Sequence, residues 1–431
     1  MATDTPSPTE PDVTKDTGRT TFEDIDWDEV DGSIKTWTVR RLAWLLAIGT
    51  YTALLAYDVY SRFSERIYVG IVSRVTGENP HTMDVPGIVA GSSPAEFPVV
   101  GEINGVLWLY SLTLLVGFFY VLVPLYQNRR MTMYYWQEFK KNKAAVISLI
   151  YLVVIFLIGL SVPRIVPPPS VEPLLAYQPP IGATVSSTTP IQCVGEASDG
   201  VCHGSWEHPL GTSTDGKDLL ISIIYGMEIS MQVGLVGMMI QLVIATSVGL
   251  TAAYYGGYVD EVLMRYVDIQ ITFPTFFLYL LIVYLFGGSL FLIIVIFGIL
   301  GWGGICRIVR SEALQRREEE YVMAAKSAGA GSLWTMRRHL LPNVSNSVIT
   351  AATLAIPFLI LSEAGLAFLG LGDPRLPSWG ETIAAGRGDL DRAWWISTLP
   401  GVFLFLTILA FNFLGDALRD ALDPRNQGGA E

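Results

Sequence analysis

The stretch Glu318–Asn343, EEEYVMAAKSAGAGSLWTMRRHLLPN, is a charged island between two long apolar segments. Its charged side chains are costly in lipid, so we expect it to be an aqueous loop. The three carboxylates that open it favour the positive end of a helix dipole, and Gly329 stands where that helix needs a C-terminal cap. Ser332 is expected to N-cap a second short helix. Pro342 is expected to prevent simple continuation of the second helix into the next apolar run.

The composition indicates a polytopic membrane protein. Of 431 residues, 51% are hydrophobic and only 16% are charged, and the mean hydropathy is +0.43. The first 34 residues are polar and acidic, with ten Asp and Glu against Lys15 and Arg19. This composition predicts a disordered tail, and no cleavable signal is apparent. With a net charge of −12, the chain is not expected to bind nucleic acid.

Eight apolar runs are long enough to be spans, because about 20 residues cover the hydrocarbon core of a bilayer. They are residues 42–60, 103–126, 144–162, 229–254, two spans within 271–305, 347–369 and 393–414. The pair within 271–305 is expected to turn at Gly287-Gly288-Ser289, and Pro274 is tolerable in a membrane helix. The basic residues favour one side of the membrane, which predicts a multi-pass protein of the cell membrane with both termini in the cytoplasm.

These patterns divide the chain into four parts. We expect an acidic, disordered cytoplasmic tail (1–36), an extension with two membrane helices (37–130), a first core helix with a long external loop (131–227), and a transmembrane domain (228–425) that contains the cytoplasmic loop 310–345. The long loop opens with the Pro-rich VPRIVPPP and has Lys217 as its only basic residue after Val166. Its end, GKDLLISIIYGM, is expected to be a helix that leads into the fourth span.

Cys193 and Cys202 lie in this external loop with two histidines, His203 and His208. A disulfide between the two cysteines suits an external location. Two free thiols, or a zinc or nickel site, remain alternatives by residue type, and the disulfide is preferred. No metal site is therefore assigned.

Two further features have both a functional and a structural interpretation. The segment GTSTDGKD (211–218) is close to the phosphate-binding pattern GxxxxGK[ST], but Asp218 replaces the hydroxyl that binds Mg²⁺ and no strand precedes it. We therefore expect no ATPase site in this chain. Glu363 interrupts an apolar span, where a carboxylate is costly unless it faces a cavity or a partner. It is a candidate either for lining a pathway or for a hydrogen bond between helices.

The charged island resembles the cytoplasmic EAA loop of importer-type ABC permeases, with Met323 where the family most often has Glu. Other stretches resemble the C-type permease subunit of dipeptide, oligopeptide and nickel ABC importers. They are WQEFKKNKAAVISLIYLVVIFL (136–157), HPLGTSTDGKDLLISIIYG (208–226), GGYVDEVLMRYVDIQITFP (256–274), SEAGLAFLGLGDPRLPSWG and LAFNFLGDALRDALDPR. With the island, the resemblance covers roughly residues 136–425, about two thirds of the chain.

The resemblance implies an all-α fold with the six-helix core of type I ABC importers, to which two extra N-terminal membrane helices are added. It implies a permease subunit that forms half of a path for peptides. Its implied partners are a second homologous permease, two ATPase subunits or domains, an extracellular solute-binding protein and the lipid bilayer. ATP would be bound by the ATPase partners, so no cofactor is expected here. The residues assigned to ATPase coupling are Glu320, Met323, Ala324, Ala325, Gly329, Leu341 and Pro342.

Other functions remain open at this stage. The same family includes importers of nickel and of other small solutes, and nothing in this chain distinguishes these from peptides. A secondary transporter driven by an ion gradient would be expected to show an inverted repeat, and no internal repeat is visible. A structural membrane protein without solute flux is a third class. No motif of an enzyme active site is present, so an enzyme is not expected.

Overall fold

The computed structural model describes residues 41–58, 60, 96–97, 101–102 and 105–422. The predicted acidic tail (1–36) lies outside these residues, as does most of the polar segment after the first apolar run. The chain divides into two compact units, Met1–Pro80 and His81–Glu431. In the first unit, residues 41–58 are helical.

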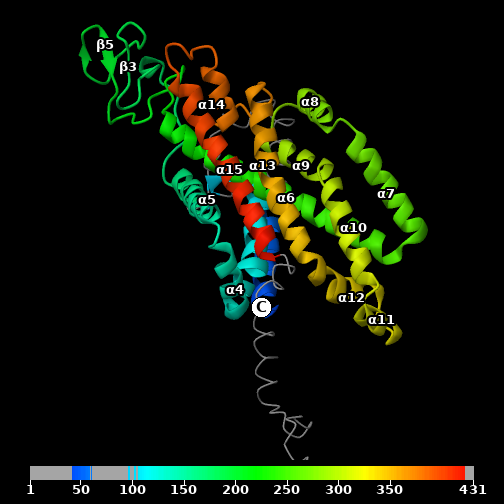
Figure 1. Ribbon diagram of the computed structural model, residues 1–431. Helices are drawn as coiled ribbons and strands as arrows, with labels where there is room; N and C mark the ends of the chain where they lie inside the picture. The colour runs from blue at the N-terminus through cyan, green and yellow to red at the C-terminus, as the bar shows by residue number, and fades with distance from the viewer. Residues whose placement is uncertain (1–40, 59, 61–95, 98–100, 103–104, 423–431) are drawn as a thin grey trace, which may run out of the picture. The chain divides into compact units, whose positions relative to one another are not determined.

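The described part of the second unit is mainly helical (Figure 1). After two paired two-residue strands, its elements in order are α2 (Gly105–Gly117), the π turn Phe118–Leu122, α3 (Val123–Gln127), α4 (Arg129–Phe139), α5 (Lys143–Ser161), α6 (Leu219–Tyr255), α7 (Gly257–Thr272), α8 (Thr275–Phe286), α9 (Leu290–Leu300), α10 (Gly303–Arg317), α11 (Glu320–Ser327), α12 (Ser332–Thr335), the π turn Met336–Leu340, α13 (Leu341–Phe368), α14 (Trp379–Gly386) and α15 (Trp395–Leu422). The first strand pair is β1 (Glu96–Phe97) with β2 (Gly101–Glu102).

α6 is the central helix of the bundle. It packs against α5, α9, α10 and α13, and it approaches two of them closely. A Cβ on Gly249 would lie 2.9 Å from the carbonyl oxygen of Cys306 in α10, and one on Gly298 in α9 would lie 2.7 Å from Ile240. Glycine at these positions therefore lets the backbones of α6, α9 and α10 pack together. The predicted short helix before the fourth span is the first part of α6, which is one continuous helix of 37 residues.

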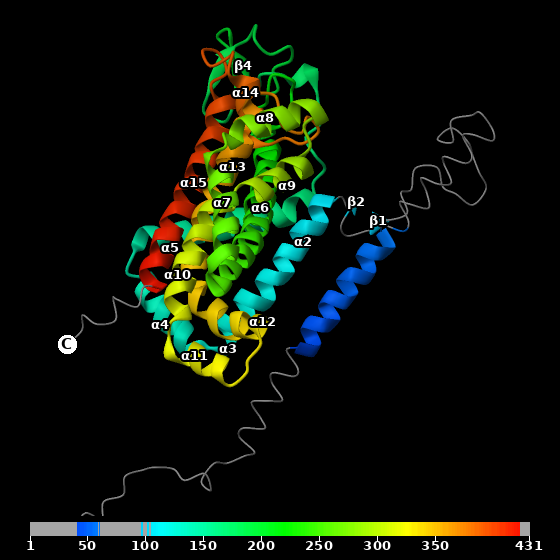
Figure 2. The same ribbon diagram turned by 90° about the vertical axis from the view of Figure 1, so that its right-hand side faces the viewer.

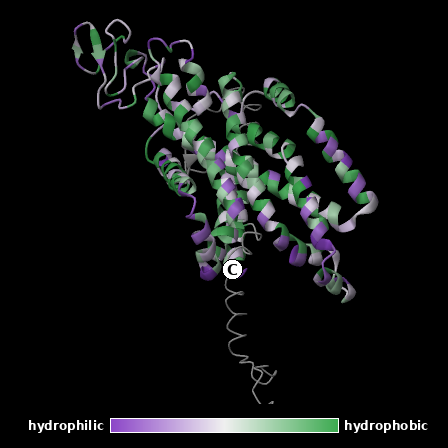
Figure 3. Cartoon of the chain, in the orientation of Figure 1, coloured by the Kyte–Doolittle hydropathy of each residue, from purple (hydrophilic) through white to green (hydrophobic). Residues whose placement is uncertain are grey.

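The described residues contain six helices long and apolar enough to cross a membrane, or seven if one bent pair is counted as a span. The eight predicted spans are not all among them. The helix at residues 41–58, which corresponds to the first predicted span, is not one of the candidates. Figure 3 shows the apolar middle of the bundle and the polar residues that gather on α7, on α4 and around α10 to α12.

The predicted pair of spans within 271–305 is partly wrong. The turn at Gly287 is confirmed, because α8 ends at Phe286 and α9 begins at Leu290. However, α8 has only 12 residues, which is about 18 Å of helix and too short to span. It forms a bent pair with α7, at an angle of 74°. The break follows from Pro274, which disfavours helical geometry at Phe273, where ψ is 136°.

The loop predicted to be external forms a small sheet at one end of the bundle (Figure 1). β5 (Val201–His203) lies between β3 (Thr184–Ser186) and β4 (Ala197–Ser198), antiparallel to both. A disulfide joins Cys193 to Cys202. The carboxamide oxygen of Gln178 accepts from the Val194 N–H at 3.0 Å, beside this disulfide. The disulfide and this hydrogen bond hold the irregular part of the loop against the sheet.

The segment GTSTDGKD is used to begin α6. Asp218 is the N-cap of that helix, and its carboxylate accepts from the Ile221 N–H at 3.0 Å. The other carboxylate oxygen lies 2.8 Å from Nδ1 of His208. The indole N–H of Trp395 in α15 donates to the carbonyl of Thr212 at 3.2 Å. Asp218 therefore has a structural role in place of the magnesium-binding hydroxyl of a phosphate-binding loop.

Candidate coupling site

The charged island forms a helical hairpin at the end of the bundle opposite the sheet, and it is made of α11 and α12 (Figures 1 and 2). α11 is held by one fully buried side chain, Val322, which packs in a cluster with Ala313, Met336 and Leu340. Because these neighbours come from α10 and from the start of the following span, α11 is packed onto both helices that flank it.

The start of α11 differs slightly from the prediction. Glu319 is the N-cap and Glu320 is in the first turn, as expected for carboxylates at a helix N-terminus. Glu318 instead ends α10, where its carboxylate lies 2.8 Å from the guanidinium of Arg317. Two of the three predicted acidic residues therefore lie at the N-terminus of α11.

The end of α11 has the predicted glycine cap. Gly329 has φ of +84°, in the left-handed region. Its N–H donates to the carbonyl of Lys326 at 2.9 Å, and the Ala330 N–H donates to the carbonyl of Ala325 at 3.0 Å. Nothing lies within 4 Å of a Cβ placed on Gly329, so glycine is required here by backbone conformation and not by space.

Two predictions about the second helix are wrong. The N-cap of α12 is Gly331, and the side chain of Ser332 does not cap it. Pro342 does not interrupt the helix either, since residues Ser332–Phe368 form one helical run. The π turn from Met336 to Leu340 explains this, because the Leu341 N–H donates to the carbonyl of Met336. Pro342 then falls in the first turn of α13, where a missing N–H costs little.

The outer surface of the hairpin is apolar for an aqueous loop. Tyr321 is 40% exposed, Met323 49%, Leu333 77% and Trp334 54%. The rings of Tyr321 and Trp334 both contact the ring of His339, with centroids 5.8 and 5.0 Å apart. Such a patch of exposed large apolar side chains is typical of a surface that binds another protein.

The residues assigned to coupling are distributed around this surface. Met323, Ala324, Glu320 and Pro342 are exposed, whereas Ala325 is half-buried against the body of the hairpin. Leu341 is 36% exposed. Tyr321, Leu333 and Trp334 also lie on this surface and were not predicted. Their signal was present, because single large apolar residues among charged neighbours in an aqueous loop are unfavourable unless another surface covers them.

Polar contacts join α6, α7 and α10 beside the hairpin, and one cation–π contact joins the hairpin itself to α6. The guanidinium of Arg310 binds Asp260 of α7 through two contacts of 2.5 Å. The guanidinium of Arg317 donates to the carbonyl of Ala253 in α6 at 2.9 Å, and Lys326 of α11 lies 4.8 Å from the centre of the Tyr254 ring. α6, α7 and α10 are therefore joined at the end that carries the hairpin, which suits a rigid lever.

Glu363 lies near the other end of α13 and is 3% exposed. Its carboxylate lies near Ser378, the N-cap of α14. The two helices touch here, because a Cβ on Gly380 would lie 2.2 Å from the carbonyl oxygen of Ala364. The structure thus places Glu363 at a contact between two helices. A role in lining a pathway stays a prediction.

The loops at this end carry two titratable groups with shifted pKa values. Hydrogen bonds from Arg375 lower the pKa of Asp373. Burial raises the pKa of Glu381, and Lys217, 3.8 Å away, acts in the opposite direction. Asp373 also accepts from the Leu290 N–H at 3.4 Å, so it anchors the start of α9 to the loop after α13.

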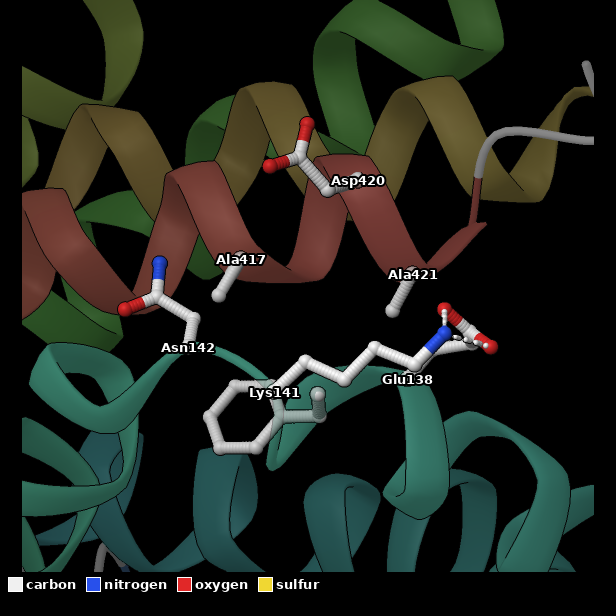
Figure 4. Close-up of a pocket in the computed structure, with 7 residues that line it drawn as sticks. Glu138, Lys141, Asn142, Ala417, Asp420 and Ala421 are labelled. Atoms are coloured by element: carbon white, nitrogen blue, oxygen red, sulfur yellow. Dashed lines mark hydrogen bonds and ion pairs between the residues drawn. The ribbon is translucent and has the colours of Figure 1, made fainter. Parts of the chain in front are cut away.

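A cavity of about 290 Å³ lies between the turn from α4 to α5 and the end of α15 (Figure 4). Its lining residues are Glu138, Phe139, Lys141, Asn142, Ala417, Asp420 and Ala421. The ammonium of Lys141 is 2.7 Å from the carboxylate of Glu138. None of these residues belongs to the hairpin, so this cavity is separate from the candidate coupling site.

Comparison with known proteins identifies the family of this chain. Residues 215–428 match the model of the binding-protein-dependent transport system inner membrane component. The chain belongs to this family. Residues 131–180 match a second model, the N-terminal transmembrane domain of oligopeptide transport permease C. The resemblance seen in the sequence is confirmed, and so is the helical membrane fold of this permease.

Proteins of several bacteria are similar to this chain at nearly the same sequence identity. The permease is 35% identical over 297 residues to the oligopeptide transport system permease protein OppC of Haemophilus influenzae, covering 68% of this chain and 89% of that protein. It is 35% identical to OppC of Escherichia coli, covering 68% and 92%. It is 34% identical to the dipeptide transport system permease protein DppC of Alkalihalophilus pseudofirmus, covering 67% and 88%. Among solved structures, a crystal structure of an amino acid ABC transporter with histidines matches with a TM-score of 0.37 and 15% identity, over 46% of this chain and 92% of that chain.

Proposed function

We propose that this permease forms half of the translocation path of an ATP-driven importer of peptides. The observation that carries the proposal is the hairpin of α11 and α12, which presents an exposed apolar surface while Val322 and the Gly329 cap fix its conformation. An ATPase that docks on this surface would move the bundle through α10 and α13. The relatives are named for oligopeptide and dipeptide transport, which supports peptides as the solute.

The proposed complex contains a second homologous permease, two ATPase subunits or domains and an external binding protein. ATP binds only to the ATPase partners. Met323, Ala324, Ala325 and Gly329 lie at the ATPase contact, with Glu320 and Leu341 beside it, and Pro342 helps to set the direction in which the hairpin joins α13. The expected result of purification from native membrane is co-purification of these partners. Isolation of the permease alone from gently solubilised membrane would argue against an importer complex.

We also propose eight spans, with the bent pair α7–α8 counted as one and the helix at residues 41–58 as another, and with both termini in the cytoplasm. Trp206, 84% exposed, follows β5, and Leu333, 77% exposed, is in α12. β5 and α12 lie at opposite ends of the bundle (Figure 1). Trp206→Cys should react with a membrane-impermeant maleimide from outside the cell, and Leu333→Cys should react only after permeabilisation. Background reaction should be low, because Cys306 is fully buried and the other two cysteines are bonded to each other. The reverse pattern of labelling would contradict the proposed orientation.

A further inference from the structure

Two neighbouring helical connections are interrupted inside the bundle. α7 ends at Thr272 and is followed by the bend at Phe273 and Pro274. α9 ends at Leu300, and α10 begins at Gly303. The carbonyls at a helix C-terminus and the N–H groups at a helix N-terminus lack intrahelical partners. In a membrane environment, such groups must be satisfied by other parts of the protein.

Two buried glutamines donate to carbonyls at the end of α9, and only one of them supplies partners that the helix lacks. The carboxamide nitrogen of Gln241 in α6 donates at 2.9 Å to the carbonyl of Phe297, which also accepts the Gly301 N–H at 3.0 Å. The carboxamide nitrogen of Gln270 in α7 donates to the carbonyls of Ile299 and Leu300, both at 3.2 Å. Gln241 is 3% exposed and Gln270 is 7% exposed. Gln270 therefore reaches from the end of α7 to the end of α9, and joins the two interruptions.

The carboxamide oxygen of Gln270 is buried and makes no hydrogen bond. It lies 3.0 Å from the position that a Cβ would take on Gly303, the first residue of α10. The first N–H groups of α10 have no carbonyl within their own helix to bind. A small tilt of α10 would bring one of them onto this oxygen. The unused acceptor thus suits a second position of α10.

The helices on either side of the two breaks are anchored separately. α7 and α10 form an inner pair, joined by Arg310 to Asp260 and by Arg307 to Asp268 at 2.6 Å. α8 and α9 form an outer hairpin that is anchored by the Asp373 contact to the loop after α13. The chain links the inner pair to the outer hairpin twice, from α7 to α8 and from α9 to α10, and each link contains one of the two breaks.

We infer that Gln241 and Gln270 are positioning residues of a double joint. At this joint, the inner pair tilts relative to the outer hairpin when the α11–α12 hairpin is moved. Gln270 keeps the carbonyls of Ile299 and Leu300 hydrogen-bonded, and Gln241 holds the preceding turn of α9 to α6, so the break costs little free energy in either position of α10. This inference rests on the proposed function, because it needs an ATPase that moves the hairpin. It goes beyond that function by locating the two breaks at which movement of the hairpin changes the tilt of the helices.

The joint is tested by distances between spin labels in the complete importer, with and without trapped ATP. Tyr258→Cys and Gln315→Cys place labels at exposed positions of α7 and α10, and Phe286→Cys places one at the end of α8. The distance from residue 286 to residue 315 should change by more than about 2 Å, the scale of helix shifts in such transitions. The distance from 258 to 315 should stay constant. Equal changes in both distances, or a change only in the second, would overturn the joint.

A variant and its control then distinguish a role of Gln270 in the joint from a general effect on stability. Gln270→Leu should abolish the change in the 286–315 distance and lower peptide uptake per ATP by about tenfold, a typical size for coupling between sites. The matched control is Gln232→Leu, since Gln232 is also a buried glutamine of the bundle but bonds Glu228 within its own helix. The control should keep both the distance change and uptake. Normal coupling in Gln270→Leu, or an equal loss in the control, would refute the inference.

A second variant covers the case in which Gln270→Leu does not fold. In Gly303→Ala, the added methyl group would lie 2.8 Å from Ile271 and 3.0 Å from the Gln270 oxygen. It should therefore restrict the joint without removing a hydrogen bond. Uptake should fall while ATP hydrolysis continues. If the unaltered complex shows no ATP-driven uptake, the proposed function fails; if it transports and Gly303→Ala transports equally well with the same distance change, the joint alone fails.

Discussion

Replacing Gly329 by valine should separate ATP hydrolysis from transport. Gly329 has φ of +84°, and a β-branched residue there costs about 1–2 kcal/mol in the left-handed region. The cap of α11 would open and displace the docking surface. A change of about 1.4 kcal/mol corresponds to a factor of ten, so uptake per ATP should fall about tenfold. The measurement compares peptide uptake with ATP hydrolysis in vesicles that contain the complete importer.

The chain offers a close control for this variant. Gly331 lies two residues away, has φ of −66° and, like Gly329, has open space around its Cβ position. Gly331→Val should therefore transport almost normally, whereas Gly329→Asn should recover part of the loss, because asparagine tolerates the left-handed region. Full transport by Gly329→Val, or an equal defect in Gly331→Val, would contradict a role of the cap in coupling.

Breaking the Arg310–Asp260 ion pair should both destabilise the permease and uncouple it. The two side chains are 31% and 18% exposed and meet through two contacts of 2.5 Å. Removing one partner leaves the other charge partly buried, and after allowance for solvent screening we expect a loss of about 2 kcal/mol. Arg310→Gln should therefore lower the thermal stability of the purified complex and reduce its uptake per ATP.

A double-mutant cycle of Arg310→Gln and Asp260→Asn measures the interaction energy of this ion pair. The interaction energy should be at least about 1 kcal/mol, as for residues in direct contact. Arg307 and Asp268 join the same two helices but are 52% and 46% exposed, so the same cycle there should give a value near zero. Additive effects of Arg310→Gln and Asp260→Asn would show that the pair does not hold α7 to α10.

The cap of α11 was predictable, but the start of α12 and its continuation into α13 were not. The Gly329 cap follows from local sequence, because only a left-handed residue can end such a helix in that way. Pro342 was expected to stop the next helix, yet the π turn before it accommodates the missing N–H. That turn depends on how Met336 and Leu340 pack against α10 and α11. Continuation of the helix through Pro342 therefore depends on tertiary packing, which a local sequence pattern does not contain.

The interrupted helices show the same limit. The apolar run over 271–305 was interpreted as two spans, because the hydropathy of a segment does not show the direction of its helix axis. The bend at Pro274 could have been suspected from the effect of proline on Phe273, but the break between α9 and α10 has no proline. It is recognised only when Gln270 is seen to bind the carbonyls of Ile299 and Leu300. Similarly, Glu363 interrupts a span in sequence, but its neighbour Ser378 is known only from the fold.

The central claim is that ATP, consumed by partner subunits, drives peptide import through this permease. The most direct measurement is uptake of a labelled oligopeptide into vesicles that contain the complete complex and its binding protein, with ATP and ion gradients controlled independently. We expect uptake that requires ATP on the side of the α11–α12 hairpin and continues when ion gradients are abolished. Uptake that persists without ATP and stops with the ion gradient would contradict it and indicate a secondary transporter.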